Sequence, residues 1–124
     1  MRVWIMVGSI LGCLSVILGA FGAHSLKNIL TEAQLGGFKT AVQYQFMHSI
    51  ALILIGVLLG QTDEAAHKRI KRAGKFFVAG IVLFSGSIYT LTLGGPRFMG
   101  PITPLGGLCF MTGWIILAIS IPKK

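Results

Sequence analysis

Four long stretches without a charged side chain divide the sequence, with short polar segments between them. They are Val3–Leu26, Thr40–Thr62, Phe76–Pro96 and Phe98–Pro122. Each stretch can cross a hydrocarbon core of roughly 30 Å as a helix, because a helix rises about 1.5 Å per residue. Only helices or closed barrels can span a bilayer, and these runs lack the strict alternation of barrel strands. The pattern therefore predicts transmembrane helices.

The same pattern predicts the fold class, an all-α membrane protein with four transmembrane helices in an up-down bundle. The expected helices cover about residues 3–24, 32–60, 74–94 and 104–121 of a single domain, 1–124. The first stretch is longer than the apolar core of a usual secretory signal, so we expect a retained helix. These spans use nearly the whole chain and leave no room for a soluble domain.

The polar segments carry signals for where helices begin. Apolar residues recur at helical spacing between the first two spans, which predicts a short interfacial amphipathic segment. They are Leu26, Ile29, Leu30 and Ala33. Thr31 and Gln34 fit a capping box, so the second helix should begin near Glu32. Thr103 followed by Pro104 predicts the N-cap and first residue of the fourth helix.

The composition agrees with a membrane protein. Hydrophobic residues make up 54% of the chain and charged residues 11%, with a mean hydropathy of +0.82. In ordinary soluble domains about a quarter of residues are charged. The net charge of +8 would suggest a nucleic-acid partner for a soluble protein. Here the basic residues flank the spans and report orientation first, so we expect no nucleic-acid partner.

The distribution of basic residues predicts the orientation. Eight of the eleven Lys and Arg residues share one side of the membrane if both termini and the second loop lie there. They are Arg2, Lys68, Arg69, Lys71, Arg72, Lys75, Lys123 and Lys124. Since basic loops face the cytoplasm, we expect a plasma-membrane protein with cytoplasmic termini, and with loops 27–39 and 94–104 outside. The basic cluster is interpreted as a topology determinant that touches anionic lipid; a regulatory or nucleic-acid contact is the alternative.

Small residues form a stripe along one face of the first span. They recur at offsets of four and three, at Gly8, Gly12, Ser15, Gly19 and Gly22. Small side chains let membrane helices approach closely, which supplies packing energy where lipid is as apolar as leucine. We interpret the four glycines as helix-packing positions, within the bundle or between copies. A lining for a narrow conduit is the alternative.

Polar residues from all four spans fall at a similar depth. Counting about 1.5 Å per residue from the inner ends places them roughly 14–18 Å deep. This candidate polar layer comprises Ser15, His48, Ser85, Ser87 and Thr112. His48 is its only ionisable member and therefore a functional candidate. It could be a neutral hydrogen-bonded spacer, a proton- or solute-handling group, or a metal or haem ligand. His24 lies more than about 10 Å higher, which opposes a haem held by both histidines.

A second candidate site lies at the outer end of the bundle. Its members are His24, Gln45, Arg97 and Thr103. The N-terminus of the fourth helix carries a partial positive charge, so together they could hold an anion or a phospholipid headgroup. A capped helix with an interfacial arginine is the plainer interpretation. Cys13 and Cys109 show no metal-ligand spacing, and we expect no metal and no cofactor.

Four ordered motifs carry a family resemblance. They are Gly19-Ala-Phe-Gly-Ala-His24, Ala41-Val-Gln-Tyr-Gln-Phe-Met-His48, Phe84-Ser-Gly-Ser-Ile-Tyr89 and Gly100-Pro-Ile-Thr-Pro-Leu-Gly-Gly107 with Gly113-Trp114. The chain resembles the small bacterial membrane proteins of domain-of-unknown-function family 423, also catalogued as uncharacterised protein family 0382. It is similar to eukaryotic transmembrane protein 256. The resemblance implies a multi-pass plasma-membrane protein with four helices and carries over no catalytic residue.

These observations lead to one expected function and one alternative. We expect a non-enzymatic small integral membrane protein, a packing or accessory subunit or a homo-oligomer, with membrane lipids and a larger membrane complex or further copies as partners. The alternative is a transporter-like or lipid-binding protein that uses the polar layer around His48 and the outer site near Arg97. A membrane enzyme is disfavoured because no intramembrane carboxylate, nucleophile–base pair or metal-ligand set is visible.

Overall fold

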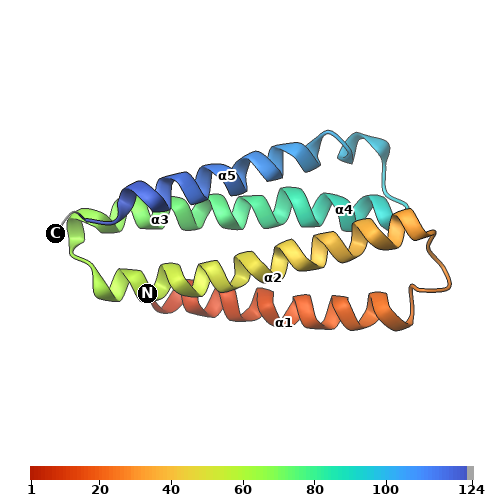
Figure 1. The fold of residues 1–124 in the computed structure, drawn as a ribbon, viewed down its shortest axis with the longest axis horizontal. Helices are drawn as coiled ribbons and strands as arrows, with labels where there is room; N and C mark the ends of the chain where they lie inside the picture. Colours follow the sequence, from red (N-terminus) through yellow and green to blue (C-terminus); the bar gives the residue numbers. More distant parts are fainter. Residues whose placement is uncertain (123–124) are drawn as a thin grey trace.

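The computed structural model describes residues 1–122, and every regular element in that range is helical (Figure 1). The long helices are α1 (Arg2–His24), α2 (Glu32–Gln61) and α5 (Ile102–Ser120). The third span joins α3 (Glu64–Gly80), a π-helical turn η1 (Ile81–Ser85) and α4 (Gly86–Thr92); a short 3-10 turn, η2 (Arg97–Met99), precedes α5. Four helical runs are long and apolar enough to cross a membrane. The predicted all-α fold with four spanning helices is confirmed.

The connection between α1 and α2 is a run of turns closed by a helix cap. Leu26 and Leu30 make one hydrogen-bonded turn, so the amphipathic segment expected here is too short to form a helix. Leu26 is buried whereas Ile29 is 75% exposed. The capping box is confirmed: the Thr31 hydroxyl accepts from the Gln34 backbone N–H, and the Gln34 side chain accepts from the Thr31 N–H. These bonds start α2 at Glu32, as predicted.

The third span begins ten residues earlier than the expected residue 74. α3 starts at Glu64, so the basic cluster lies on a helix and not in a loop. The charged residues occupy the exposed side, while Ala66, Ile70 and Phe77 recur at helical spacing and are buried in the core. A search for uncharged runs misses such an amphipathic start. Glu64–Thr92 is about 43 Å long at 1.5 Å per residue, longer than a hydrocarbon core of about 30 Å.

The start of α5 also differs from the prediction. The helix begins at Ile102 with Pro101 as its N-cap, so Thr103 is not the cap. The reason is that η2 and Gly100 already turn the chain into a helical direction, and the Thr103 N–H bonds to the Gly100 carbonyl. Pro104 still fits, because the first turn of a helix leaves its backbone N–H groups without intrahelical partners.

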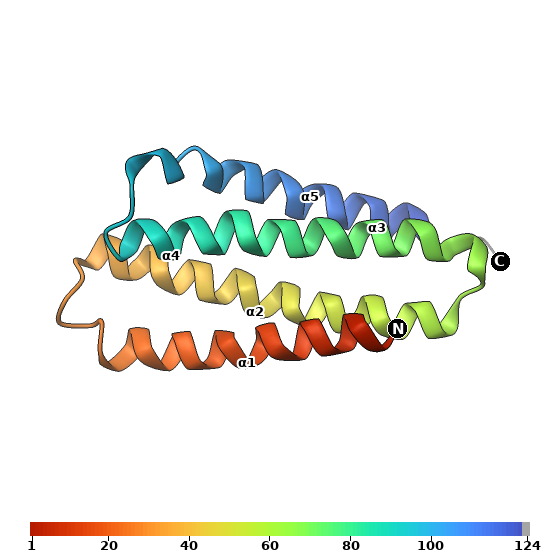
Figure 2. The same ribbon diagram turned by 180° about the vertical axis from the view of Figure 1, so that it is seen from behind.

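The four spans form two antiparallel hairpins that lie side by side (Figures 1 and 2). α1 packs mainly against α2, and α5 packs against α3 and η1; α2 joins the two hairpins through α3, η1 and α4. The buried core lies where α2, the third span and α5 meet. Its members are Ala51, Leu52, Ile55, Leu59, Ala66, Ile70, Ala73, Phe77, Ile81 and Phe110.

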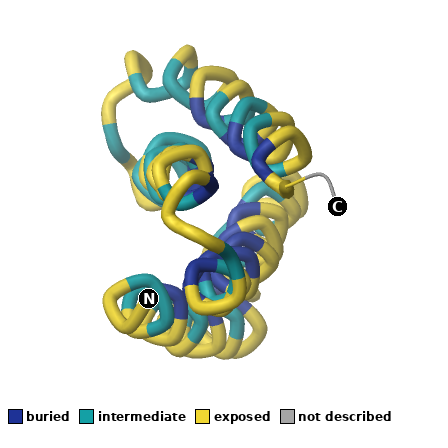
Figure 3. Tube along the Cα trace, turned by 90° about the vertical axis from the view of Figure 1, so that its left-hand side faces the viewer, coloured by how far each residue is buried: buried dark blue, intermediate teal, exposed yellow. Residues whose placement is uncertain are grey.

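The outer sides of the helices are exposed and apolar. Figure 3 shows buried segments turned toward the middle of the bundle and exposed segments around it. The most exposed large side chains on α1 and α5 include Val3, Val16, Ile115 and Ile119, each more than 60% exposed. Such a surface suits hydrocarbon rather than water. The N-terminus and the C-terminal end of α5 lie at the same end of the bundle (Figure 1).

Candidate functional site

His48 lies in the middle of α2 with both ring nitrogens paired. Nδ1 lies 2.7 Å from the Tyr44 carbonyl oxygen, and Nε2 lies 3.1 Å from the indole nitrogen of Trp114. A carbonyl only accepts and an indole N–H only donates. The hydrogen-bond network therefore assigns the hydrogen to Nδ1 and leaves Nε2 as the acceptor. His48 is a neutral imidazole whose ring nitrogens both have partners within the protein.

Aromatic rings surround the His48 imidazole. It stacks on Phe110 of α5 with ring centroids 3.7 Å apart and ring planes 13° apart. Phe77 of α3 packs against it at an inclined angle, with centroids 5.5 Å apart. The side chain is only 4% exposed. His48 thus ties α2 to α5 and to the core. Of the three interpretations of this residue, this arrangement fits the neutral hydrogen-bonded spacer.

A separate network connects the two hairpins through Gln45. The Tyr89 hydroxyl donates to Gln45 Oε1 at 2.6 Å, and Gln45 Nε2 donates to the Leu11 carbonyl at 2.9 Å. The Ser15 hydroxyl donates to the same carbonyl at 2.8 Å. One glutamine side chain on α2 therefore joins α4 to α1. Buried amides cost free energy in lipid unless they are bonded in this way.

The serines of the third span bond elsewhere. Ser85 donates to the Ala41 carbonyl of α2 at 2.7 Å. Ser87 bonds to the Phe84 carbonyl at 3.0 Å and shares a hydrogen bond of 2.5 Å with the Thr103 hydroxyl of α5. Ser85 lies in the π-helical turn, and its hydroxyl ties that irregular backbone to α2. Each serine thus fixes one helix pair.

The expected polar layer is therefore not a single network. Ser15, His48, Ser85 and Ser87 are all buried, but their side chains bond to carbonyls or to residues outside the layer. Thr112 bonds to the Leu108 carbonyl of its own helix, and its side chain takes no part in the His48 contacts. Four of the five residues face the interior of the bundle, as a polar residue within a span should. Which way each side chain points depends on the rotation of its helix, which depth does not give.

The four residues of the expected outer site are not brought together. Gln45 is buried in its network with Tyr89, and Thr103 is paired with Ser87. His24 ends α1, whereas Arg97 begins η2 next to α5, and both are exposed. Within residues 1–122 no hydrogen bond or salt bridge joins any two of them. The prediction of an outer anion site made from these four residues has no geometric support.

Two functional partners were missed by sequence reasoning, Tyr89 and Trp114. Both are aromatic residues with a polar atom; Trp114 lies well inside α5, and Tyr89 lies three residues from the end of α4. A Tyr O–H or Trp N–H that is removed from water usually finds a hydrogen-bond partner. Those polar atoms are the signal that could have paired them with Gln45 and His48.

The glycine stripe of α1 faces α2. A Cβ added at Gly8 would lie 2.6 Å from the Ser49 carbonyl oxygen, and one at Gly12 would lie 3.3 Å from the Ser49 hydroxyl. Farther along, Gly19 approaches Val42, and Gly22 approaches the Phe38 ring. All four glycines thus lie at the seam between α1 and α2. Side chains other than hydrogen at Gly8 or Gly22 would push the two helices apart.

A groove opens to the membrane beside His48. Its volume is about 420 Å³, and it is lined by Tyr44, Met47, His48, Phe84, Gly107, Phe110, Met111 and Trp114. The walls are aromatic and methionine side chains, which adapt to apolar occupants.

Among residues 1–122 no group of three or more His, Cys, Asp or Glu side chains is close enough to hold a metal ion. The hydrogen bonds of His48 and Gln45 join neighbouring helices and hold them in register.

Comparison with known proteins identifies the family. The model of the family described as "Protein of unknown function (DUF423)" matches residues 18–107. UPF0382 membrane protein SH2409 of Staphylococcus haemolyticus is 42% identical over 99% of this chain and 98% of its own. UPF0382 membrane protein YwdK of Bacillus subtilis is 38% identical over the same shares. No solved structure matches the chain. With these matches and four apolar spans, the chain is a small integral membrane protein that belongs to the DUF423 family.

Proposed function

We propose that this protein is a non-enzymatic membrane subunit that assembles with further copies of itself or with a larger membrane complex. The observation that carries the proposal is the complete internal use of its polar groups. Among the described residues, every buried side-chain nitrogen and oxygen has a hydrogen-bond partner within the chain. The acceptors are mostly backbone carbonyls of neighbouring turns and helices. Such groups stabilise a bundle, and none of these buried atoms is left free for a reaction.

The face of α1 that lies away from α2 is the proposed contact for assembly. α1 is bound to the rest of the chain mainly through α2, so most of its surface is open. In the half of α1 near the N-terminus, Ser9 and Cys13 are both exposed and four residues apart. This is the small-xxx-small spacing at which membrane helices associate. Met6 and Ile10 flank the pair and are more than half exposed.

Cysteine cross-linking in native membranes tests the contact. Cys13 and Cys109 are both free, so no cysteine needs to be introduced. Oxidation with copper phenanthroline should give a covalent dimer through Cys13 when two copies pack on this face, since a disulfide requires Cα atoms within about 7 Å of each other. The dimer should persist in Cys109→Ser and disappear in Cys13→Ser.

The two single variants act as controls for each other. A Cys13 product that contains a different protein would identify the accessory-subunit form of the same proposal. The assembly proposal is wrong if Cys109→Ser gives no cross-linked product, or if Cys13→Ser cross-links as efficiently as the natural chain.

The proposed location is the plasma membrane with both termini in the cytoplasm. Six of the eight basic residues assigned to the cytoplasmic side lie in the described part of the chain. They are Arg2 and the five basic residues of α3, at the end of the bundle where α1 begins. The same prediction for Lys123 and Lys124 concerns residues outside the described part of the chain. Arginine and lysine next to a span are retained on the cytoplasmic side during insertion.

Labelling of two introduced cysteines tests this orientation. Asn28 lies in the turn after α1, and Gln61 is the last residue of α2, at opposite ends of the bundle. In a background without Cys13 and Cys109, Asn28→Cys should react with a membrane-impermeant maleimide added to intact cells. Gln61→Cys should react only after lysis. Reaction of both from the same side would overturn the topology.

A lipid-binding function is the second candidate. It is supported by the aromatic groove beside His48, whose volume of about 420 Å³ is comparable to a small-molecule site. The transporter-like form of this candidate has less support, because both nitrogens of His48 are engaged within the protein. A lipid-binding function requires no titrating group.

A further inference from the structure

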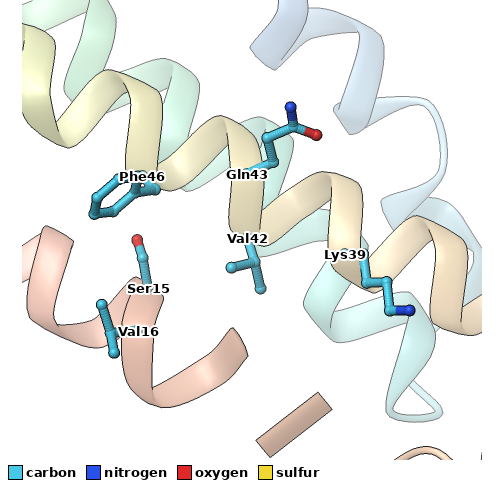
Figure 4. A pocket seen from close by; sticks show the side chains of 6 residues that line it. All are labelled: Ser15, Val16, Lys39, Val42, Gln43 and Phe46. Carbon is cyan, nitrogen blue, oxygen red and sulfur yellow. The ribbon is translucent and has the colours of Figure 1, made fainter. Parts of the chain in front are cut away.

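A second groove lies on the seam between α1 and α2. Its volume is about 320 Å³, and its lining residues are Ser15, Val16, Lys39, Val42, Gln43 and Phe46. Ser15 and Val16 come from α1 and the other four from α2 (Figure 4). In this view Phe46 and the Lys39 amine lie at opposite ends of the row of side chains. The groove is thus apolar along its length and cationic at one end.

The position of the groove along the bundle matches one leaflet of a bilayer. Counting about 1.5 Å per residue along α2 from Gly60, Phe46 lies roughly 21 Å from the terminus-side boundary and Lys39 roughly 32 Å from it. A hydrocarbon core is about 30 Å thick. Lys39 therefore lies at headgroup level in the leaflet opposite the termini, and the remainder of the groove lies within that leaflet's acyl chains.

The ammonium group of Lys39 has no partner among the described residues. No salt bridge or hydrogen bond within residues 1–122 reaches it, and the side chain is exposed. Of the three acidic residues in the chain, only Glu32 lies at this end of the bundle. Asp63 and Glu64 are at the opposite end, at the start of α3. The charge at this end of the groove is complementary to a phosphate.

We infer that this groove binds one anionic phospholipid, with the lipid phosphate on the Lys39 ammonium and an acyl chain along Val42, Val16 and Phe46. A zwitterionic headgroup brings its own ammonium beside Lys39 and fits less well, because like charges repel. The Ser15 hydroxyl hydrogen does not bond to the lipid phosphate, since it is donated to the Leu11 carbonyl. The groove adjoins the Cys13 contact of the proposed assembly, because Val16 lies one turn from Cys13 on α1, and it is separate from the groove beside His48.

Native mass spectrometry of the delipidated protein in detergent tests the site. The probe lipids are dioleoyl phosphatidylglycerol and dioleoyl phosphatidylcholine, which share acyl chains and differ in net charge. We expect one retained phosphatidylglycerol, bound about fivefold more tightly than phosphatidylcholine, the effect of roughly one favourable charge contact at a membrane surface. Lys39→Gln should remove this preference.

A groove-filling variant separates the acyl-chain contact from the charge. Val16 is 63% exposed, so Val16→Phe can place its ring in the groove without entering the core. It should weaken the binding of both lipids several-fold. The matched controls are Lys27→Gln, which removes an exposed lysine from the loop before α2, and Val57→Phe, which enlarges an exposed valine outside the groove. Both controls should bind lipid like the natural chain.

The inference is overturned if Lys39→Gln and Val16→Phe retain phosphatidylglycerol as well as the natural chain. It is also overturned if Lys27→Gln loses as much affinity as Lys39→Gln, since binding would then follow the overall charge of this end and not the groove. Lys39→Gln changes α2 and leaves the Cys13 face of α1 intact, so failure of the assembly proposal and failure of the lipid site can be told apart.

Discussion

Replacing Gly106 with alanine is expected to destabilise the bundle, whereas the same change at the adjacent Gly107 is not. A Cβ at Gly106 would collide with backbone atoms of Leu83 and Phe84 in η1. Backbone atoms cannot rotate away, so α5 must move off the third span, and overpacking of this kind typically costs about 1–3 kcal/mol. Gly106→Ala should therefore have a lower midpoint of thermal unfolding than Gly107→Ala, measured in detergent by circular dichroism.

Gly107 supplies a matched control one position along the same helix. A Cβ there has no atom within 4 Å, so Gly107→Ala meets open space. Alanine favours a helix over glycine by up to about 1 kcal/mol, so this variant should be as stable as the natural chain or slightly more stable. Equal stability of Gly106→Ala and Gly107→Ala would show that α5 does not approach η1 as closely as described.

Replacing His48 with alanine is expected to have the second large effect. It removes the acceptor for the Trp114 indole N–H and the ring that stacks on Phe110. The indole is left with an unpaired donor, and the truncated side chain leaves a cavity. Trp114 is 45% exposed, but hydrocarbon offers its N–H no other partner; an unsatisfied donor away from water costs about 1–3 kcal/mol, and membrane hydrogen bonds lie toward the lower part of that range. Together with the lost packing, we expect about 2–3 kcal/mol, measured as a fall in the unfolding midpoint.

His48→Gln separates hydrogen bonding from titration. A glutamine amide oxygen can accept from the Trp114 N–H but cannot take up a proton at neutral pH. This variant should recover part of the stability that His48→Ala loses. Thr112→Ala is the control, because Thr112 bonds only within α5 and its loss should change stability by less than about 0.5 kcal/mol. The structural role of His48 is refuted if His48→Ala is as stable as Thr112→Ala.

The helices could be predicted from the sequence because their signals are local. Uncharged runs defined four spans, and the Thr31–Gln34 pair fixed the start of α2 to the residue. The start of α3 at Glu64 could not be found in this way. Its charged residues interrupt the uncharged run by which a span is recognised. Its helix is stabilised by burial of Ile70 and Phe77 in the core, which the local sequence does not reveal.

For the candidate site, the sequence predicted only how far along each span the polar residues lie. Counting residues grouped Ser15, His48 and Ser85 correctly as buried polar positions. It could not supply their partners, because hydrogen bonds join residues far apart in sequence. Gln45 and Tyr89 are 44 positions apart, and His48 and Trp114 are 66 apart. The rotation of each helix decides such pairs, and that rotation follows from packing of the whole bundle.

The pairing of His48 with Trp114 has a consequence for the order of events during synthesis. α2 precedes α5 in the chain, so the Nε2 lone pair of His48 has no partner in the protein until Trp114 has been synthesised and inserted. Gln45 differs, because one of its two partners, the Leu11 carbonyl, is already present in α1. The Nε2 of His48 is therefore satisfied only when the final span docks. A chain that ends before α5 lacks Trp114 and leaves the imidazole of His48 with an unpaired acceptor in the hydrocarbon.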